Sequence, residues 1–192
     1  AGESQIDNLI GDLEQLSNPT VGLAAHAGRV DVRITAKAET KEQAMALIEA
    51  VEKQVVDRLG NWIYGTDQET LEQVALRNIR SKGWTLAVLE SGLKGELVHM
   101  LATDRGSFIG GEISTDPLSP EDLVRWMENH PLRQHAEVIL GAALHPGKER
   151  QEIYLACHTP QGERLVPLSY GGPPGYAPIW AANQGLDLLR KI

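Results

Sequence analysis

The sequence has few of the residues that define several classes of protein. It contains one cysteine, Cys157, and aromatic residues make up 5% of its 192 residues. A single cysteine excludes an internal disulfide. There is no basic-then-apolar leader and no run of 18 apolar residues, so the sequence predicts a soluble, cytoplasmic protein that does not enter the membrane. Because the first residue is Ala1, we expect a processed product or an expressed fragment.

Positive charge is also scarce. The chain has 18 Lys and Arg against 26 Asp and Glu, a formal net charge of −8. Residues 1–82 and 83–192 each contain 9 basic and 13 acidic residues, so neither half is basic. Because binding to phosphates needs clustered Lys and Arg, nucleic acid is not an expected partner.

Metal ligands are not spaced as in a metal site. The six histidines are scattered, and Pro131 breaks any helical pairing of His130 with His135. Cys157 and His158 are adjacent on a predicted strand and therefore point to opposite faces. We predict no metal and no cofactor, and we interpret Cys157 as a buried small hydrophobic residue.

The first part of the chain predicts a small α+β domain. Residues 4–16 have helical spacing, and residues 30–38 alternate apolar and polar side chains as a half-buried strand does. Capping boxes at Thr40 and Thr66 predict helices that end near Gly60 and Gly83, with a short strand over residues 61–64 between them.

The second part alternates helices and strands, which is typical of an α/β domain. One strand is expected directly after Thr85. Further strands are expected over residues 108–113, 138–143, 153–157 and 165–168. Ser119 and Pro120 predict a helix start, and residues 181–189 predict a final helix. We place the boundaries at residues 1–17 (N-terminal helix or linker), 18–82 and 83–192.

Ser91 follows the apolar run 84–89 at a predicted change from strand to helix. A serine there can be a nucleophile beneath helix amides, or it can simply cap the helix. The G-x-S-x-G pattern of serine hydrolases is absent, so the spacing alone favours the cap.

Several segments closely resemble the competence/damage-inducible CinA family. They are Ser4-Gln5-Ile6, Asn18-Pro19-Thr20-Val21-Gly22-Leu23-Ala24-Ala25-His26, residues 30–38, Ile63-Tyr64-Gly65-Thr66, and Leu86-Ala87-Val88-Leu89-Glu90-Ser91, which is similar to the family's A-E-S-C-T-G-G segment. The resemblance ends at Leu186-Asp187-Leu188-Leu189. It is strong to Ser91 and weak after it.

The resemblance implies an α+β KH-like domain followed by an α/β CinA C-terminal domain of the nicotinamide mononucleotide deamidase type. Active relatives hydrolyse the amide of that nucleotide. Full-length relatives also carry an N-terminal domain like those that bind molybdopterin, which we expect this chain to lack. Relatives are dimers, so a homodimer is expected. The KH-like half has no G-x-x-G loop, so a spacer or dimerisation role fits it better than RNA binding.

The resemblance makes Ser91 the candidate nucleophile. Candidate ligand-binding residues surround it: Glu90, Gly92, Lys94 and Gly95. The family's tyrosine and lysine, in Y-S-N-E-A-K, fall on Thr115 and Pro120, and neither can take a proton from serine. Its arginine-bearing loops fall on Gly172-Pro173-Pro174 and on Pro178, Ile179 and Trp180, which hold no cation. The resemblance therefore implies a degenerate site.

Three hypotheses follow. The first is a CinA-like protein whose deamidase-type domain is not catalytic and serves a structural or regulatory role. The second is an active amidohydrolase that deamidates nicotinamide mononucleotide through Ser91 with an unrecognised base. The third is ligand sensing without turnover, with a small nucleotide as the ligand.

Overall fold

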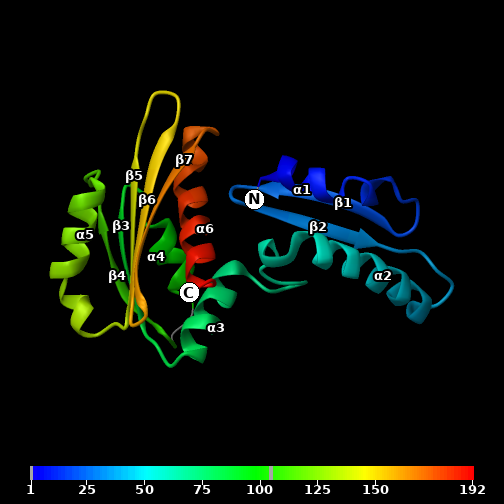
Figure 1. The fold of residues 1–192 in the computed structure, drawn as a ribbon, viewed down its shortest axis with the longest axis horizontal. Helices are drawn as coiled ribbons and strands as arrows, with labels where there is room; N and C mark the ends of the chain where they lie inside the picture. Colours follow the sequence, from blue (N-terminus) through cyan, green and yellow to red (C-terminus); the bar gives the residue numbers. More distant parts are fainter. Residues whose placement is uncertain (1, 104–105) are drawn as a thin grey trace. The chain divides into compact units, whose positions relative to one another are not determined.

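The chain folds into two compact units in a computed structural model that describes residues 2–103 and 106–192 (Figure 1). The units are Ala1–Tyr64 and Gly65–Ile192. Residue 1 of the expected N-terminal segment and residues 104–105 of the expected second domain lie outside the described residues.

The first unit is a β-hairpin packed against two helices. Its elements are α1 (Glu3–Ile10), a 3-10 turn (Leu13–Gln15), β1 (Thr20–His26), β2 (Arg29–Thr35) and α2 (Lys41–Leu59). The strands are antiparallel, with Val21 opposite Ile34. Alternate side chains of β2 pack against a core to which both helices contribute Ile6, Ile10, Val51, Val55 and Leu59. The expected N-terminal helix is thus part of this core.

Local signals located α2 correctly and misplaced the segment after it. The Thr40 side chain caps α2 by accepting a hydrogen bond from the Gln43 N–H, and Gly60 ends the helix with φ 50°. The expected strand over residues 61–64 is wrong, because Gly60–Trp62 forms a 3-10 turn. The predicted capping box at Thr66 is also wrong, because the helix α3 (Leu71–Ser81) begins at a box formed by Thr70 and Gln73.

The second unit is built on a five-stranded sheet in the order β4-β3-β5-β6-β7. The strands are β3 (Leu86–Ser91), β4 (Phe108–Ser114), β5 (Val138–His145), β6 (Gln151–Thr159) and β7 (Gly162–Tyr170). β3 runs parallel to β4 and β5, whereas β6 and β7 are antiparallel to their neighbours. β3 is buried at all six residues, because helices cover both faces of the sheet at its centre.

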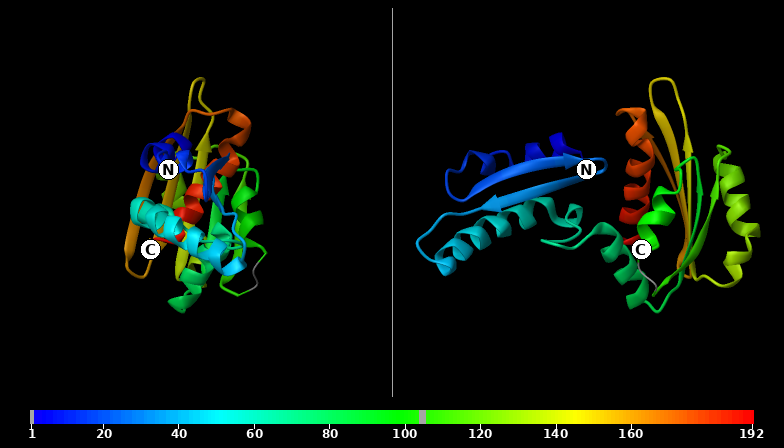
Figure 2. Two further views of the ribbon diagram at one scale, coloured as in Figure 1. Left: turned by 90° about the vertical axis from the view of Figure 1, so that its right-hand side faces the viewer. Right: turned by 180° about the vertical axis from the view of Figure 1, so that it is seen from behind.

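The helices of this unit lie on opposite faces of the sheet (Figure 1; Figure 2). α5 (Pro120–Asn129) packs on β5 and β6 from one side. On the other side, α6 (Ala177–Leu189) packs on β5 and contacts α3 and α4 (Glu96–Leu101). Ser119 caps α5 through the Asp122 N–H, as the sequence predicts.

Helix α3 belongs to the second unit, although the sequence placed it in the first domain. The boundary was expected at residues 81–83, whereas the two units divide between Tyr64 and Gly65. The physical reason is packing: Leu76 and Ile79 are fully buried in a helix that contacts α6, and the Asn78 side chain donates hydrogen bonds to the carbonyls of Leu189 and Ile192.

Candidate functional site

Ser91 ends β3 and is followed by a tight turn that leads into α4. Three residues of this turn have positive φ: Gly92 (75°), Lys94 (61°) and Gly95 (89°). A Cβ atom at position 92 would lie 2.6 Å from the carbonyl oxygen of Leu144, so glycine is required there. Lys94 is exposed and takes a left-handed conformation that is costly for a side chain with a Cβ atom.

The Ser91 hydroxyl is fully buried and makes two hydrogen bonds within the protein. It donates to the carbonyl oxygen of Asp116 at 2.5 Å, and it accepts from the N–H of Leu118 at 3.2 Å. Both partners belong to residues 115–118, which we call the strap. The hydroxyl therefore fastens this loop to the end of β3.

Two further contacts hold the strap. The Gly92 N–H donates to the carbonyl of Ser114 at 3.2 Å, next to the strap. The Nε2 atom of His145, at the end of β5, contacts the carbonyl oxygen of Leu118. Because a carbonyl oxygen only accepts, Nε2 must carry the hydrogen in this contact. Leu118 is thus bonded through its N–H to Ser91 and through its C=O to His145.

Glu90 acts inside the protein as the cap of α4. Its side chain is fully buried, and its Oε2 accepts hydrogen bonds from the N–H groups of Leu97 (3.0 Å) and Val98 (3.2 Å). Gly95, at the helix start, has no side chain that could cap these donors. Burial raises the pKa of the Glu90 carboxyl, and the backbone N–H groups partly oppose that shift.

The remaining predicted residues are not gathered around the hydroxyl. Lys94 is exposed, whereas Leu93 beside it is fully buried in the core. Thr115 is exposed at the start of the strap, and Pro120 is the first residue of α5. Within residues 2–103 and 106–192, the hydrogen bonds of the Ser91 side chain are those to Asp116 and Leu118. Neither partner is a lysine, a histidine or a carboxylate.

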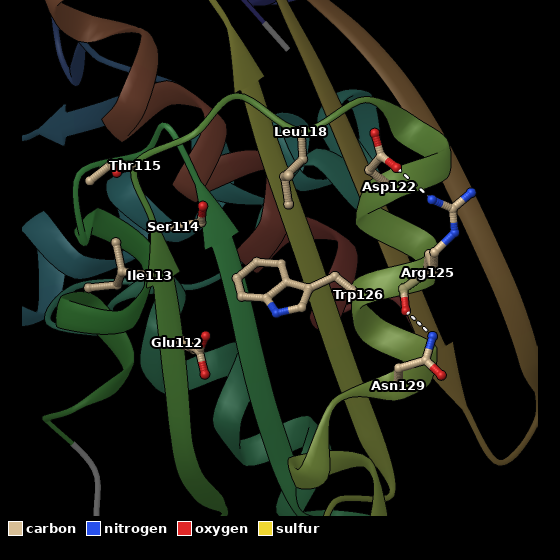
Figure 3. A pocket seen from close by; sticks show the side chains of 9 residues that line it. All are labelled: Glu112, Ile113, Ser114, Thr115, Leu118, Asp122, Arg125, Trp126 and Asn129. Carbon is tan, nitrogen blue, oxygen red and sulfur yellow. Dashed lines mark hydrogen bonds and ion pairs between the residues drawn. The ribbon is translucent and has the colours of Figure 1, made fainter.

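A groove of about 640 Å³ lies between α5 and the edge strand β4, on the face that α5 only partly covers (Figure 3). Ser114, Thr115 and Leu118 form one end of it, and Ser91 is not among the residues that line it. The Trp126 indole lies across its floor, and Glu112 and Asp122 bring negative charge. Arg125 pairs with Asp122 at 2.9 Å, and His130 pairs with Glu112 at 2.8 Å.

Outside the surroundings of Ser91, Cys157 and His158 do not form a reactive site. Burial raises the pKa of the Cys157 thiol to about 12, so the thiol is unreactive near neutral pH. His158 is engaged by Glu163 at 2.9 Å. Across the described part of the chain, no group of three or more His, Cys, Asp and Glu residues is arranged to hold a metal ion. No described helix is both long and apolar enough to cross a membrane.

Sequence reasoning missed His145, which it counted only among the scattered histidines. The strand register accounts for its position: Ser91 lies opposite Ala143 in the parallel pair β3–β5, and His145 follows two residues later on the same face. No local pattern signals this, because the two residues are 54 positions apart in the chain.

Comparisons with known proteins identify both parts of the chain. Residues 1–65 match the family model of the damage-inducible protein CinA KH domain. A CinA-like protein of Deinococcus deserti is 38% identical over 209 aligned residues, which cover 99% of this chain and 51% of that protein. A CinA-like protein of Gloeothece citriformis is 41% identical over 118 residues, covering 60% of this chain and 28% of that protein. The chain thus spans about a quarter to a half of these relatives' length.

Solved structures support the fold. A CinA superfamily protein of Escherichia coli superposes with a TM-score of 0.50 at 15% identity, covering 70% of this chain and 98% of that structure. A CinA superfamily protein of Enterobacter cloacae gives a TM-score of 0.51 at 12% identity, with 67% and 95% covered. At such identities the likeness concerns the fold alone. The Deinococcus match, which covers 99% of this chain, and the CinA KH match over residues 1–65 show that the chain belongs to the CinA family, with a KH-like unit followed by an α/β unit.

Proposed function

We propose that this chain is a cytoplasmic, homodimeric CinA-like protein whose deamidase-type unit does not turn over substrate as it is folded here. Its role would be structural or regulatory, or it would bind a small nucleotide without hydrolysing it. The observation that carries the proposal is the bonding of Ser91: the hydroxyl hydrogen is given to the Asp116 carbonyl, and the oxygen is covered by the strap.

Amide hydrolysis by serine needs a base, donors for the developing oxyanion and room for the substrate. A carbonyl oxygen is not a useful base, and general-base assistance contributes roughly 100- to 10,000-fold to the rate. The resemblance places Thr115 and Pro120 where the family has its tyrosine and lysine. The fully buried hydroxyl also leaves no space for an attacked carbonyl group.

The decisive experiment incubates the purified chain with nicotinamide mononucleotide and measures ammonia and the deamidated nucleotide. We expect no product above that of the Ser91→Ala variant. Turnover by the native chain that disappears in Ser91→Ala would establish the alternative function, an active amidohydrolase. The retained serine at the strand-to-helix turn is the observation that favours this alternative.

Ligand binding without turnover has a separate readout. A thermal shift with a nucleotide, in the absence of product, supports a sensing role, and a flat response across a panel of nucleotides supports a purely structural one. Analytical ultracentrifugation tests the proposed homodimer, since a monomer mass of 21.0 kDa is readily distinguished from twice that mass.

A further inference from the structure

Leu118 fills the space between two side chains whose chemistry is complementary. Its N–H donates to the Ser91 hydroxyl at 3.2 Å, and its carbonyl contacts Nε2 of His145. The hydroxyl and the imidazole bind opposite ends of one residue, so they are separated by that residue, which spans at most about 3.6 Å, and by the two hydrogen bonds. The Leu118 backbone therefore bridges the two side chains.

The closed strap disables both side chains. Nε2 of His145 carries a hydrogen for the Leu118 carbonyl, so its lone pair is not available as a base. The Ser91 hydroxyl donates its hydrogen to the Asp116 carbonyl. Withdrawal of residues 115–118 would remove both constraints at once.

We infer that the strap is an autoinhibitory latch over a Ser91–His145 pair that is acylated by small esters when the latch opens. This inference goes beyond the proposed function, which describes the closed protein. Once the Leu118 carbonyl is gone, the imidazole no longer has to keep its hydrogen on Nε2. The tautomer with hydrogen on Nδ1 then presents the Nε2 lone pair to the serine.

In the open state, Ser91 acts as the nucleophile and His145 as the base. The Ser91 proton passes to Nε2 of His145 while Oγ forms a bond to the ester carbonyl carbon. The bond from that carbon to the leaving oxygen breaks, and the leaving oxygen departs with the electron pair and takes up the proton from the imidazolium. Water then hydrolyses the acyl-serine by the same proton transfers. The groove end formed by Ser114, Thr115 and Leu118 becomes the entrance.

The Leu118 side chain is the anchor of the latch. It packs against the apolar cluster on the α5 face, which includes Leu89, Leu123 and Ala143. Replacing it with glycine removes the anchor and adds backbone freedom to the strap. Leu132 packs on the same cluster from the 3-10 turn Pro131–Gln134, outside the strap. Leu132→Gly is therefore a matched control that weakens the cluster and leaves the strap attached.

The experiment measures acetylation of Ser91 by p-nitrophenyl acetate in the full chain, from the burst of p-nitrophenolate and by peptide mass spectrometry. We expect Leu118→Gly to acetylate Ser91 at least tenfold faster than the native chain or Leu132→Gly. Adding His145→Ala should reverse this gain, and adding Ser91→Ala should abolish it. His145→Ala alone releases the latch without a base and should leave Ser91 unreactive.

Two results would overturn the inference. One is a folded Leu118→Gly variant, verified by circular dichroism, that acetylates Ser91 no faster than the native chain. The other is a gain that survives His145→Ala. If Leu118→Gly does not fold, Pro117→Gly loosens the strap more gently; faster hydrogen exchange at the Leu118 amide without faster acetylation is then equally decisive. Failure of the proposed function has a different signature, which is release of ammonia from nicotinamide mononucleotide by the native chain.

Discussion

Replacing Ser91 with alanine should destabilise the second unit, because the hydroxyl joins β3 to the strap. The change removes one hydrogen bond to the Asp116 carbonyl and one from the Leu118 N–H. Each such bond contributes a net of about 0.5 to 1.5 kcal/mol, so the loss in the free energy of unfolding should be about 1 to 3 kcal/mol. A serine kept only for catalysis would show little or no loss.

Urea denaturation followed by tryptophan fluorescence measures this loss. A Trp62→Phe background restricts the signal to the second unit, which contains the other three tryptophans. Ser114→Ala is the control, because that hydroxyl is more exposed: it accepts from the Asp116 N–H at 3.2 Å and donates to the Asp116 carbonyl across a long 3.5 Å. We expect the control to lose less than about 1 kcal/mol. A Ser91→Ala chain within about 0.5 kcal/mol of the native one, with unchanged hydrogen exchange at the Leu118 amide, would refute the reasoning.

Three further predictions test the surroundings of the site. Lys94→Gly should raise the free energy of unfolding by up to about 1 kcal/mol, because it relieves a left-handed backbone conformation at φ 61°; a loss measured in urea would contradict this. The Glu90 carboxyl has a raised pKa, so the folded state holds its proton more tightly than the unfolded state does. The stability of the native chain relative to Glu90→Gln should therefore fall as pH rises above about 4.5 through the folded pKa, and a difference that stays constant in urea titrations across pH would disprove this. Cys157 should react with a thiol reagent at pH 8 only after unfolding, so rapid labelling of the native chain would rule out its burial.

The expected elements were correct where local physics determines them. The alternation of apolar and polar residues in β2, the cap and stop of α2, and the Ser119–Pro120 start of α5 are all short-range effects, and the structure confirms them. The boundary between the units was not predictable in this way. The apolar stripe of α3 fixes a buried face, but nothing local says which unit buries it.

The candidate site shows the same division. The sequence by itself determined that Ser91 ends a buried strand, that a turn rich in glycine follows, and that neither Thr115 nor Pro120 can act as a base. Only the tertiary structure decided what the hydroxyl does, because its two partners, Asp116 and Leu118, lie 25 and 27 residues away in the chain. The order of strands in the sheet also brings His145, at the end of β5, to the carbonyl of Leu118. Hydrogen bonds between residues that are distant in the chain depend on register and packing, and a linear pattern does not encode either.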